Sequence, residues 1–231
     1  MQSVLRPRLN LSEQIREIVR ERILDGELSP DSRINEARLA EELDVSRTPV
    51  REALMGLVSE GALRSVPGRG VFVRTLSVDE FRHIYPIRSL LDPEALRLTG
   101  LPPPGRLARL EELNEQMRRE NDAGERVRLD DAWHLELVAD CPNPVLLDLI
   151  RQFMARTRRY ELAFYRNERN RDISTEDHAR VHAAAKARDL AGAIEALVAN
   201  LTSGIEPILT WLERTYGHGT DSVEEAVRNE I

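Results

Sequence analysis

The sequence predicts a mainly α protein, with an N-terminal winged helix-turn-helix that carries a small β-hairpin wing, followed by an all-α antiparallel helical bundle. Three observations support this fold class. Apolar residues recur at helical spacing along most of the 231 residues. Two short runs that favour strands, "ALRSV" and "VFVRT", flank a glycine-containing turn. After residue 75 the sequence has no further run of that kind, so the remainder is expected to be helical.

The first predicted domain, residues 1–75, contains three helices and a hairpin. "LSEQIREIVRERILDGEL" has an apolar face and is expected to end at Gly26. "NEARLAEEL" forms a short second helix. "SRTPVREALMGLVSEG" forms a third, with Ser46 as N-cap, Pro49 in the first turn and Gly61 at the end. "PGRG" then closes a tight hairpin, and this order of elements is that of a winged helix-turn-helix.

The second predicted domain, residues 78–216, begins with a helix that Ser77 caps. Apolar periodicity and breaks rich in Gly, Pro, Asn and Asp predict its helices. We expect them at about 78–99, 106–122, 125–140, 144–167, 175–188 and 190–216. An acidic tail, residues 217–231, follows them.

Composition limits the class of protein and its compartment. The sequence is 41% hydrophobic and 32% charged, as expected for a globular protein with a core. The single cysteine, Cys141, excludes an intramolecular disulfide and fits a reducing cytosol. No segment has the length and apolar character of a membrane span or a signal peptide. We therefore expect a cytoplasmic protein without a membrane partner.

Charge is distributed unevenly between the two predicted domains. The net charge is −7, but residues 1–75 contain 12 Arg and 12 Asp or Glu, so the whole excess of acid lies in the remainder. Residues 45–74 hold five Arg against two Glu. Lys186 is the only lysine, and Arg binds phosphate groups and guanine edges in a bidentate manner that Lys cannot reproduce. The sequence therefore predicts a local basic patch suited to nucleic acid.

The third predicted helix explains that patch. In a helix-turn-helix this helix lies in the major groove with its N-terminal residues at the base edges. Arg47 and Arg51 lie one turn apart on one face, whereas Leu54, Leu57 and Val58 form the opposite, buried stripe.

The predicted wing and second helix add further cations. Arg69 is placed at the tip of the wing between glycines that allow a close approach to DNA, and Arg38 is expected to reach a phosphate. An alternative is that these arginines pair with Glu42, Glu52 and Glu60 on a solvated face. The combination of basic residues on helix and wing favours DNA binding.

Two arrangements of polar residues in the second domain suggest a buried site. "DDAWH" places Asp130 and His134 at i and i+4, on one helical face, a pair suited to a divalent metal. If the last two helices form an antiparallel hairpin that turns near Asp189, His178 and Asn200 both stand ~16 Å from the turn. Four potential ligands could therefore converge inside the bundle.

The motif "VSRTPVREAL" followed by "L…EG.L….GRGVFV" resembles the DNA-binding domain of the GntR family of bacterial transcription regulators, over about residues 10–74. The resemblance implies a homodimer that binds a short inverted-repeat operator in double-stranded DNA. It implies DNA contacts from the recognition helix and the wing. These residues are Arg47, Thr48 and Arg51, and Gly68, Arg69 and Gly70. A base-reading Arg of some members aligns with either Ala37 or Arg38.

The segments "RSLLDPEALRL", "DDAWHLELVADCPNPVL" and "EDHARVHAAAKARDLAGAIEALVANL" resemble the FCD ligand-binding domain of the FadR-type branch, over about residues 78–215. Many members bind a divalent metal through one Asp and three His. The matching residues are Asp130, His134 and His178, with Asn200 where the last His is expected. An amide carbonyl is a weaker ligand for Zn²⁺ or Ni²⁺, although three ligands and an open position remain a workable site. His182, one turn from His178, either substitutes for the missing His or packs or reaches solvent, because the resemblance places an ordinary helix position there.

The resemblance also implies an effector pocket beside the metal. Arg88 would clamp the carboxylate of a small organic acid, together with His134 and His178, or would instead form a salt bridge to Asp92. Arg156 and Arg159 either line the pocket or pair with Glu161, and Trp133 and Trp211 are expected to be core residues.

These observations predict a DNA-binding transcriptional regulator, most often a repressor in this family, whose operator affinity is controlled by a small carboxylate metabolite. One alternative is a metal-sensing regulator in which the ion is the signal. Another is a metal-dependent hydrolase, because a three-ligand metal with an open position resembles a catalytic zinc site. The sequence pairs no nucleophile or general base with that site, so we do not expect an enzyme.

Overall fold

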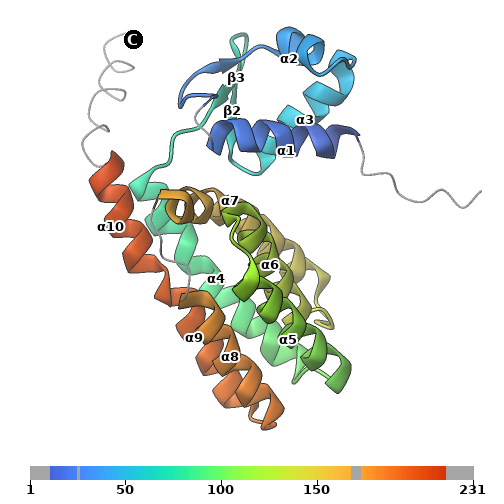
Figure 1. Ribbon diagram of the computed structural model, residues 1–231, viewed down its shortest axis with the longest axis vertical. Helices are drawn as coiled ribbons and strands as arrows, with labels where there is room; N and C mark the ends of the chain where they lie inside the picture. Colours follow the sequence, from blue (N-terminus) through green and yellow to red (C-terminus); the bar gives the residue numbers. More distant parts are fainter. Residues whose placement is uncertain (1–10, 25–26, 168–172, 217–231) are drawn as a thin grey trace, which may run out of the picture. The chain divides into compact units, whose positions relative to one another are not determined.

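The computed structural model describes residues 11–24, 27–167 and 173–216, and it divides into two compact units, Met1–Thr75 and Leu76–Ile231 (Figure 1). The predicted helix end at Gly26 and the acidic tail, 217–231, lie outside the described residues. Within the described ranges, no helix combines the length and apolar character needed to cross a membrane.

The N-terminal unit has the predicted winged helix-turn-helix architecture. Its helices are α1 (Leu11–Leu24), α2 (Glu36–Glu42) and α3 (Arg47–Ser59), and its strands are β1 (Arg33–Ile34), β2 (Leu63–Val66) and β3 (Gly70–Val73). The strands form an antiparallel sheet in the order β1-β3-β2, with Val66 opposite Gly70 at the hairpin end. The sequence did not predict β1, because a two-residue strand is too short to show an alternating pattern.

The core of this unit fixes the orientation of α3. Val50, Ala53, Leu54 and Leu57 of α3 are buried and contribute to one apolar cluster with α1 and the sheet. Val58, predicted to be buried, is only partly covered. Burial of this stripe leaves the opposite face of α3 in solvent.

The ends of the helices in this unit differ in how they are capped. Ser46 occupies the N-cap position of α3 as predicted, but its side chain makes no capping hydrogen bond. Asn35 does cap α2, since its Oδ1 accepts from the amides of Ala37 and Arg38 at 3.0 and 3.1 Å. Gly61, just after α3, has φ +76°, the left-handed conformation that glycine adopts at the end of a helix.

The C-terminal unit is a helical bundle, and within its described residues no strand occurs. Its helices are α4 (Val78–Thr99), α5 (Pro104–Arg119), α6 (Ala123–Leu137), α7 (Pro144–Asn167), α8 (Ile173–Lys186), α9 (Leu190–Ser203) and α10 (Ile205–Tyr216). The prediction of one helix over 190–216 was wrong, because the structure divides it at Gly204. Pro207 explains the division, since it lacks the N–H that would continue the hydrogen-bond ladder to the carbonyl of Ser203.

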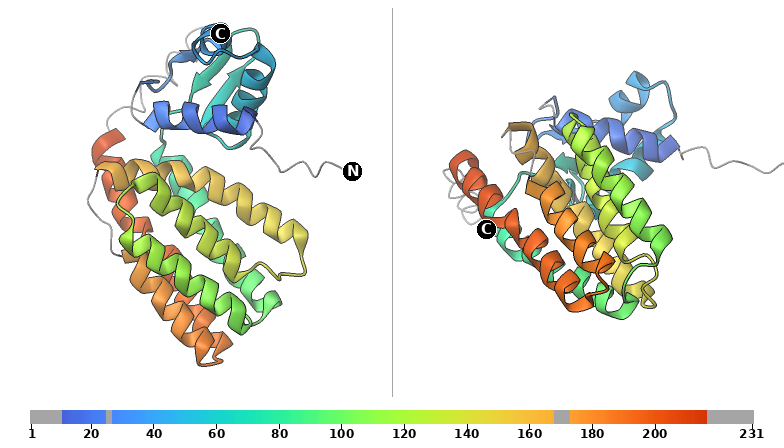
Figure 2. Two further views of the ribbon diagram at one scale, coloured as in Figure 1. Left: turned by 45° about the vertical axis from the view of Figure 1, so that its right-hand side comes forward. Right: turned by 60° about the horizontal axis from the view of Figure 1, so that its bottom comes forward.

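Two antiparallel helix pairs form much of this bundle. Figures 1 and 2 show α8 beside α9, joined by a short turn, and α5 beside α6. Asp189 caps α9 by accepting a hydrogen bond from the amide of Gly192 at 2.9 Å. One apolar core lies among these helices, and a second cluster lies where α4, α7 and α10 meet around Phe81, Tyr160 and Trp211.

Candidate functional site

The exposed face of α3 carries the predicted base-contacting residues. Arg47 and Thr48 are exposed, and the side chain of Arg51 is 73% exposed. Arg51 Nε lies 3.6 Å from Glu36 Oε2, whereas Arg47 has no ion-pair partner in the described part of the chain. Two guanidinium groups therefore stand one turn apart at the N-terminal end of α3, where the helix dipole already favours an anion.

The wing presents a single cation at its tip. Arg69 is exposed in the turn between β2 and β3, and Gly68 and Gly70 have φ +71° and +105°. Glycine is required there because side chains rarely adopt these angles. At Gly70 an added Cβ would also lie 3.1 Å from Arg33 Nε.

Within the described residues, only Glu42 of the glutamates named in the alternative pairs with one of these arginines, Arg38. Its Nε donates to Glu42 Oε1 at 2.8 Å, but its side chain is 78% exposed, and exposed pairs contribute only about 0–1 kcal/mol. Glu60 instead pairs with Arg16 and Arg20 of α1, at 3.2 and 2.7 Å. The cations of α3 and the wing therefore remain available to an anionic partner.

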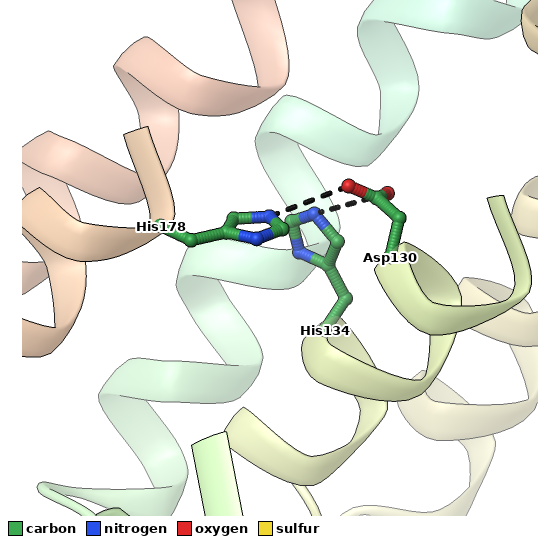
Figure 3. Close-up of side chains that lie close together, drawn as sticks. All are labelled: Asp130, His134 and His178. Carbon is green, nitrogen blue, oxygen red and sulfur yellow. Dashed lines mark ion pairs between the residues drawn. The ribbon is translucent and has the colours of Figure 1, made fainter. Parts of the chain in front are cut away.

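In the C-terminal unit, Asp130, His134 and His178 form a buried cluster. Each offers one ligand atom, and these atoms all lie within 4.8 Å of one another. Figure 3 shows Asp130 and His134 projecting from α6 towards His178 of α8. Asp130 lies 3.7 Å from His134 Nε2 and 3.4 Å from His178 Nε2.

Several polar atoms of this cluster have no hydrogen-bond partner in the structure. They are His134 Nδ1, both ring nitrogens of His178, and Oδ1 of Asn200. A buried polar atom without a hydrogen-bond partner lowers the stability of the fold by about 1–3 kcal/mol. Several such atoms close together therefore need a specific explanation. Imidazole nitrogens with oxygen ligands form a donor set that suits Zn²⁺ or Ni²⁺, so the residues present fit a divalent metal.

The electrostatic environment favours the neutral histidines that metal binding requires, but it disfavours the ionised form of Asp130. Burial, with the Arg88 cation as a second cause, lowers the pKa of His178 to about 3 and that of His134 well below its usual value. Both rings are therefore neutral near pH 7, the form that binds metals. Burial and the Glu161 carboxylate raise the pKa of Asp130 to about 8, and a divalent cation would favour its ionised form.

Asn200 of α9 is buried and lines the same cavity as Asp130 and His134. The hydroxyl of Ser203 donates to Asp177 Oδ2 at 2.9 Å, so the α8–α9 hairpin brings Asn200 near the level of His178. His182 lies away from the cluster, because its Nε2 is 3.1 Å from the carbonyl oxygen of Leu107.

Trp133 is buried, as expected of a core residue, and it also orients the cluster. Its ring is stacked on His178 with centroids 3.8 Å apart and an interplanar angle of 6°. Trp211 lies in the second apolar cluster. The stacking fixes the plane of the His178 ring and hence the direction of its nitrogens.

A cavity of about 60 Å³ adjoins the cluster. Its polar lining includes Tyr85, Arg88, Asp130, His134, Glu161 and Asn200. The alternative prediction for Arg88 is confirmed, since its buried Nη2 donates to Asp92 Oδ2 at 3.1 Å. The side chain also lines the cavity, and its predicted contact with an effector stays a prediction. Its Nε has no hydrogen-bond partner, so the guanidinium retains a donor for an anion.

The prediction for Arg156 and Arg159 was wrong. Both pair with Glu80 of α4, and neither lines the cavity. Glu161 itself lines the cavity, as does Tyr85, and neither was predicted to do so. A signal for Glu161 existed in the sequence, because it falls at helical spacing between Met154 and Phe164, on the face of α7 that also buries Thr157.

Comparisons with known proteins identify two family domains. Residues 11–73 match "Bacterial regulatory proteins, gntR family", and residues 83–203 match the "FCD domain". The first segment contains the exposed cations of α3 and the wing, and the second contains the buried cluster of Asp130, His134 and His178.

Similar proteins include named regulators. The Nta operon transcriptional regulator of Aminobacter aminovorans is 35% identical over 155 residues, which cover 66% of this chain and 72% of that protein. The regulator McbR of Escherichia coli is 30% identical over 153 residues, covering 64% and 69%.

Solved structures of similar proteins agree in fold. A GntR family member from Pseudomonas syringae pv. tomato has a TM-score of 0.56 at 30% identity and covers 92% of this chain and 91% of that one. The structure of Escherichia coli McbR has a TM-score of 0.65 at 26% identity, covering 88% and 99%.

Proposed function

The chain belongs to the gntR family of bacterial regulatory proteins and is a DNA-binding transcriptional regulator with an FCD domain. We propose that a small carboxylate metabolite, bound in the helical bundle, controls its affinity for an operator. The observation that carries the proposal is the cavity in which Arg88, with an unsatisfied Nε, adjoins the Asp130–His134–His178 cluster. A carboxylate is the ligand that satisfies both an arginine and a metal. The protein acts as a cytoplasmic repressor that releases its operator when the metabolite binds.

On the DNA side, Arg47, Thr48 and Arg51 contact base edges, and Arg69 contacts phosphate. The exposure of these side chains and the burial of the opposite face of α3 support this assignment. A homodimer places two copies of α3 on an inverted repeat, because a two-fold axis relates both the helices and the half-sites.

In the bundle, Asp130, His134 and His178 hold a divalent metal, Zn²⁺ or Ni²⁺, with the amide oxygen of Asn200 as a weaker fourth ligand. When bound, the metal supplies positive charge for an effector carboxylate. The unsatisfied nitrogens of His178 and the unsatisfied oxygen of Asn200 support this donor set, and His134 Nε2, 3.7 Å from Asp130, completes it.

The route from the cavity to the DNA-binding unit runs through α7 and the start of α4. Glu161 of α7 lines the cavity, and the hydroxyl of the preceding Tyr160 lies 3.4 Å from the amide nitrogen and 3.3 Å from the carbonyl oxygen of Ser77. Ser77 caps α4 two residues after the N-terminal unit ends at Thr75. A ligand that shifts α7 therefore acts on the segment that connects the units. It does so only if it binds one conformation of α7 and this segment more tightly than the other.

The test is operator affinity measured with the full-length protein. An operator is first selected from random duplex DNA, and its dissociation constant is then compared for metal-free protein, protein with Zn²⁺, and protein with Zn²⁺ and a panel of short carboxylates. We expect the carboxylates to weaken binding. A response to Zn²⁺ alone, with none to any carboxylate, would instead identify a metal sensor, the second candidate that the buried cluster favours.

A further inference from the structure

Glu161 is an unusual feature of the cavity. Its side chain is buried, it lines the cavity, and in the described part of the chain no Arg, Lys or His side chain lies within ion-pair distance of its carboxylate. Burial raises its pKa to about 7, although the Arg88 cation and a hydrogen bond with Tyr85 favour its ionised form. Burying a carboxylate that forms no ion pair is costly, so Glu161 at a buried position of α7 calls for a role.

Two arginines line the cavity. Arg88 uses one donor on Asp92 and leaves Nε unsatisfied, whereas Arg126 Nη1 donates to the carbonyl oxygen of Met117 at 2.7 Å. The cavity therefore offers a donor for a carboxylate from α4 and an acceptor, Glu161, from α7. A ligand that satisfies both needs a carboxylate and a hydrogen-bond donor in the same small molecule.

The size of the cavity limits the length of that molecule. Its volume is about 60 Å³, and one water-sized position requires about 10–15 Å³, so roughly four to six such positions exist. Tyr85 and Gly204 both line the cavity and pack closely, since a Cβ added at Gly204 would lie 3.0 Å from the Tyr85 hydroxyl oxygen. A long acyl chain does not fit this space.

From these observations we infer that the ligand is a short carboxylic acid that carries a hydroxyl or ammonium group beside its carboxylate, and that Glu161 is the residue that selects for this donor. This inference rests on the proposed function and specifies its ligand. Arg88 receives the carboxylate, and Glu161, oriented by Tyr85, accepts the hydrogen bond from the donor.

The experiment is a comparison of three ligands of nearly equal size by calorimetric titration of the Zn²⁺-treated full-length protein. Propionate carries no donor, lactate carries a hydroxyl and alanine carries an ammonium group. We expect lactate or alanine to bind about tenfold or more tightly than propionate, because hydrogen bonds to charged groups are among the stronger ones. If lactate binds more tightly than alanine, the preferred donor is a hydroxyl; if alanine binds more tightly, it is an ammonium group.

Matched variants assign the selectivity to Glu161. Glu161→Gln and Tyr85→Phe are expected to reduce the ratio of affinities between the preferred ligand and propionate. Glu80→Gln is expected to preserve it, because Glu80 pairs with Arg156 and Arg159, which lie outside the cavity.

The outcomes separate this inference from the proposed function. Equal affinities of the wild-type protein for all three ligands would overturn the inference and leave a carboxylate-responsive regulator in place, and this comparison needs no variant. An equal reduction of the ratio by the control variant would also overturn it. If none of the three binds and no short carboxylate alters operator affinity, the proposed function fails as well.

Discussion

The two units place arginine in opposite environments. Arg51 of the N-terminal unit has a side chain that is 73% exposed, whereas the side chain of Arg88 in the bundle is 5% exposed. An exposed guanidinium attracts a polyanion from solution, and its contribution falls as salt rises. A buried guanidinium must be compensated by specific partners, which makes it selective for a small ligand of defined shape. The two environments therefore suit arginine to DNA in the N-terminal unit and, in the proposed function, to a small metabolite in the bundle.

The largest expected effect comes from the buried site in the helical bundle. Replacing His134 with Ala removes one of three clustered ligand atoms and should lower Zn²⁺ affinity by roughly 100-fold or more, since even the partners that orient metal ligands are worth about 10–100-fold. Competition with a chelator of known affinity measures the change. His182→Ala is the matched control, because this histidine contacts the Leu107 carbonyl, and an equal loss there would contradict the assignment.

The next effect tests the exposed arginines of the N-terminal unit. Replacing Arg51 with Ala should weaken operator binding by about 1–3 kcal/mol and relax base preference, because a base-edge contact is lost. Replacing Arg69 should weaken binding to all sequences alike and reduce the salt slope by about 1, because a phosphate contact is lost. Fluorescence anisotropy on operator and scrambled duplexes at several salt concentrations measures both.

Arg97→Ala removes the same charge from an exposed residue of α4 and serves as the control for net charge. If Arg51→Ala and Arg69→Ala produce identical losses on both duplexes, neither side chain reads bases.

A smaller effect concerns pH and the buried carboxylate. The pKa of Glu161 is raised to about 7 in the folded protein, mainly by burial, so the folded state binds its proton more tightly than the unfolded chain does. Its contribution to stability is therefore full below about pH 4.5 and is lost as pH rises to about 7. Metal-free protein should therefore lose stability between pH 5 and pH 8, and Glu161→Gln should reduce this loss by about 2 kcal/mol. The reduction is not larger because Asp130 titrates in the same range and carries part of the cost of burying ionised carboxylates.

Chemical denaturation of both proteins at the two pH values measures this difference. Glu136→Gln is the control, because its carboxylate is partly exposed and pairs with Arg106. A pH dependence that Glu161→Gln leaves unchanged would show that this carboxyl does not carry it.

Much of the fold was predictable because it depends on local patterns. The α3 stripe, the wing glycines and the breaks between most bundle helices each follow from spacing, capping or turn chemistry within a few residues. The split at Gly204 was missed because the apolar pattern continues across Pro207, although the missing N–H of that proline interrupts the ladder. β1 was missed because its pairing with β3 is a long-range contact.

The candidate site was predictable only where its residues lie close together in the sequence or are related by one helical hairpin. Asp130 and His134 share one turn of α6, and the α8–α9 turn relates His178 to Asn200. The partners of Arg156 and Arg159 depend instead on how α7 rotates against α4, which no single segment encodes. Glu161 faces the cavity for the same reason, and only its helical spacing from buried residues of α7 marks it in the sequence.

The smallest expected effect sharpens the account of the metal. Asn200→His replaces an amide oxygen with an imidazole nitrogen, a better ligand for Zn²⁺, and should tighten Zn²⁺ binding by roughly tenfold, about 1.4 kcal/mol. The gain is limited because the larger ring must fit beside His134 in a cavity of about 60 Å³. Val198→His adds a histidine to an exposed position of the same helix and controls for adventitious binding. A tighter site in Asn200→His alone places residue 200 at the fourth ligand position. Unchanged affinity would mean that the α8–α9 hairpin does not bring residue 200 within reach of the metal, and the three remaining residues would then be its only ligands from this chain.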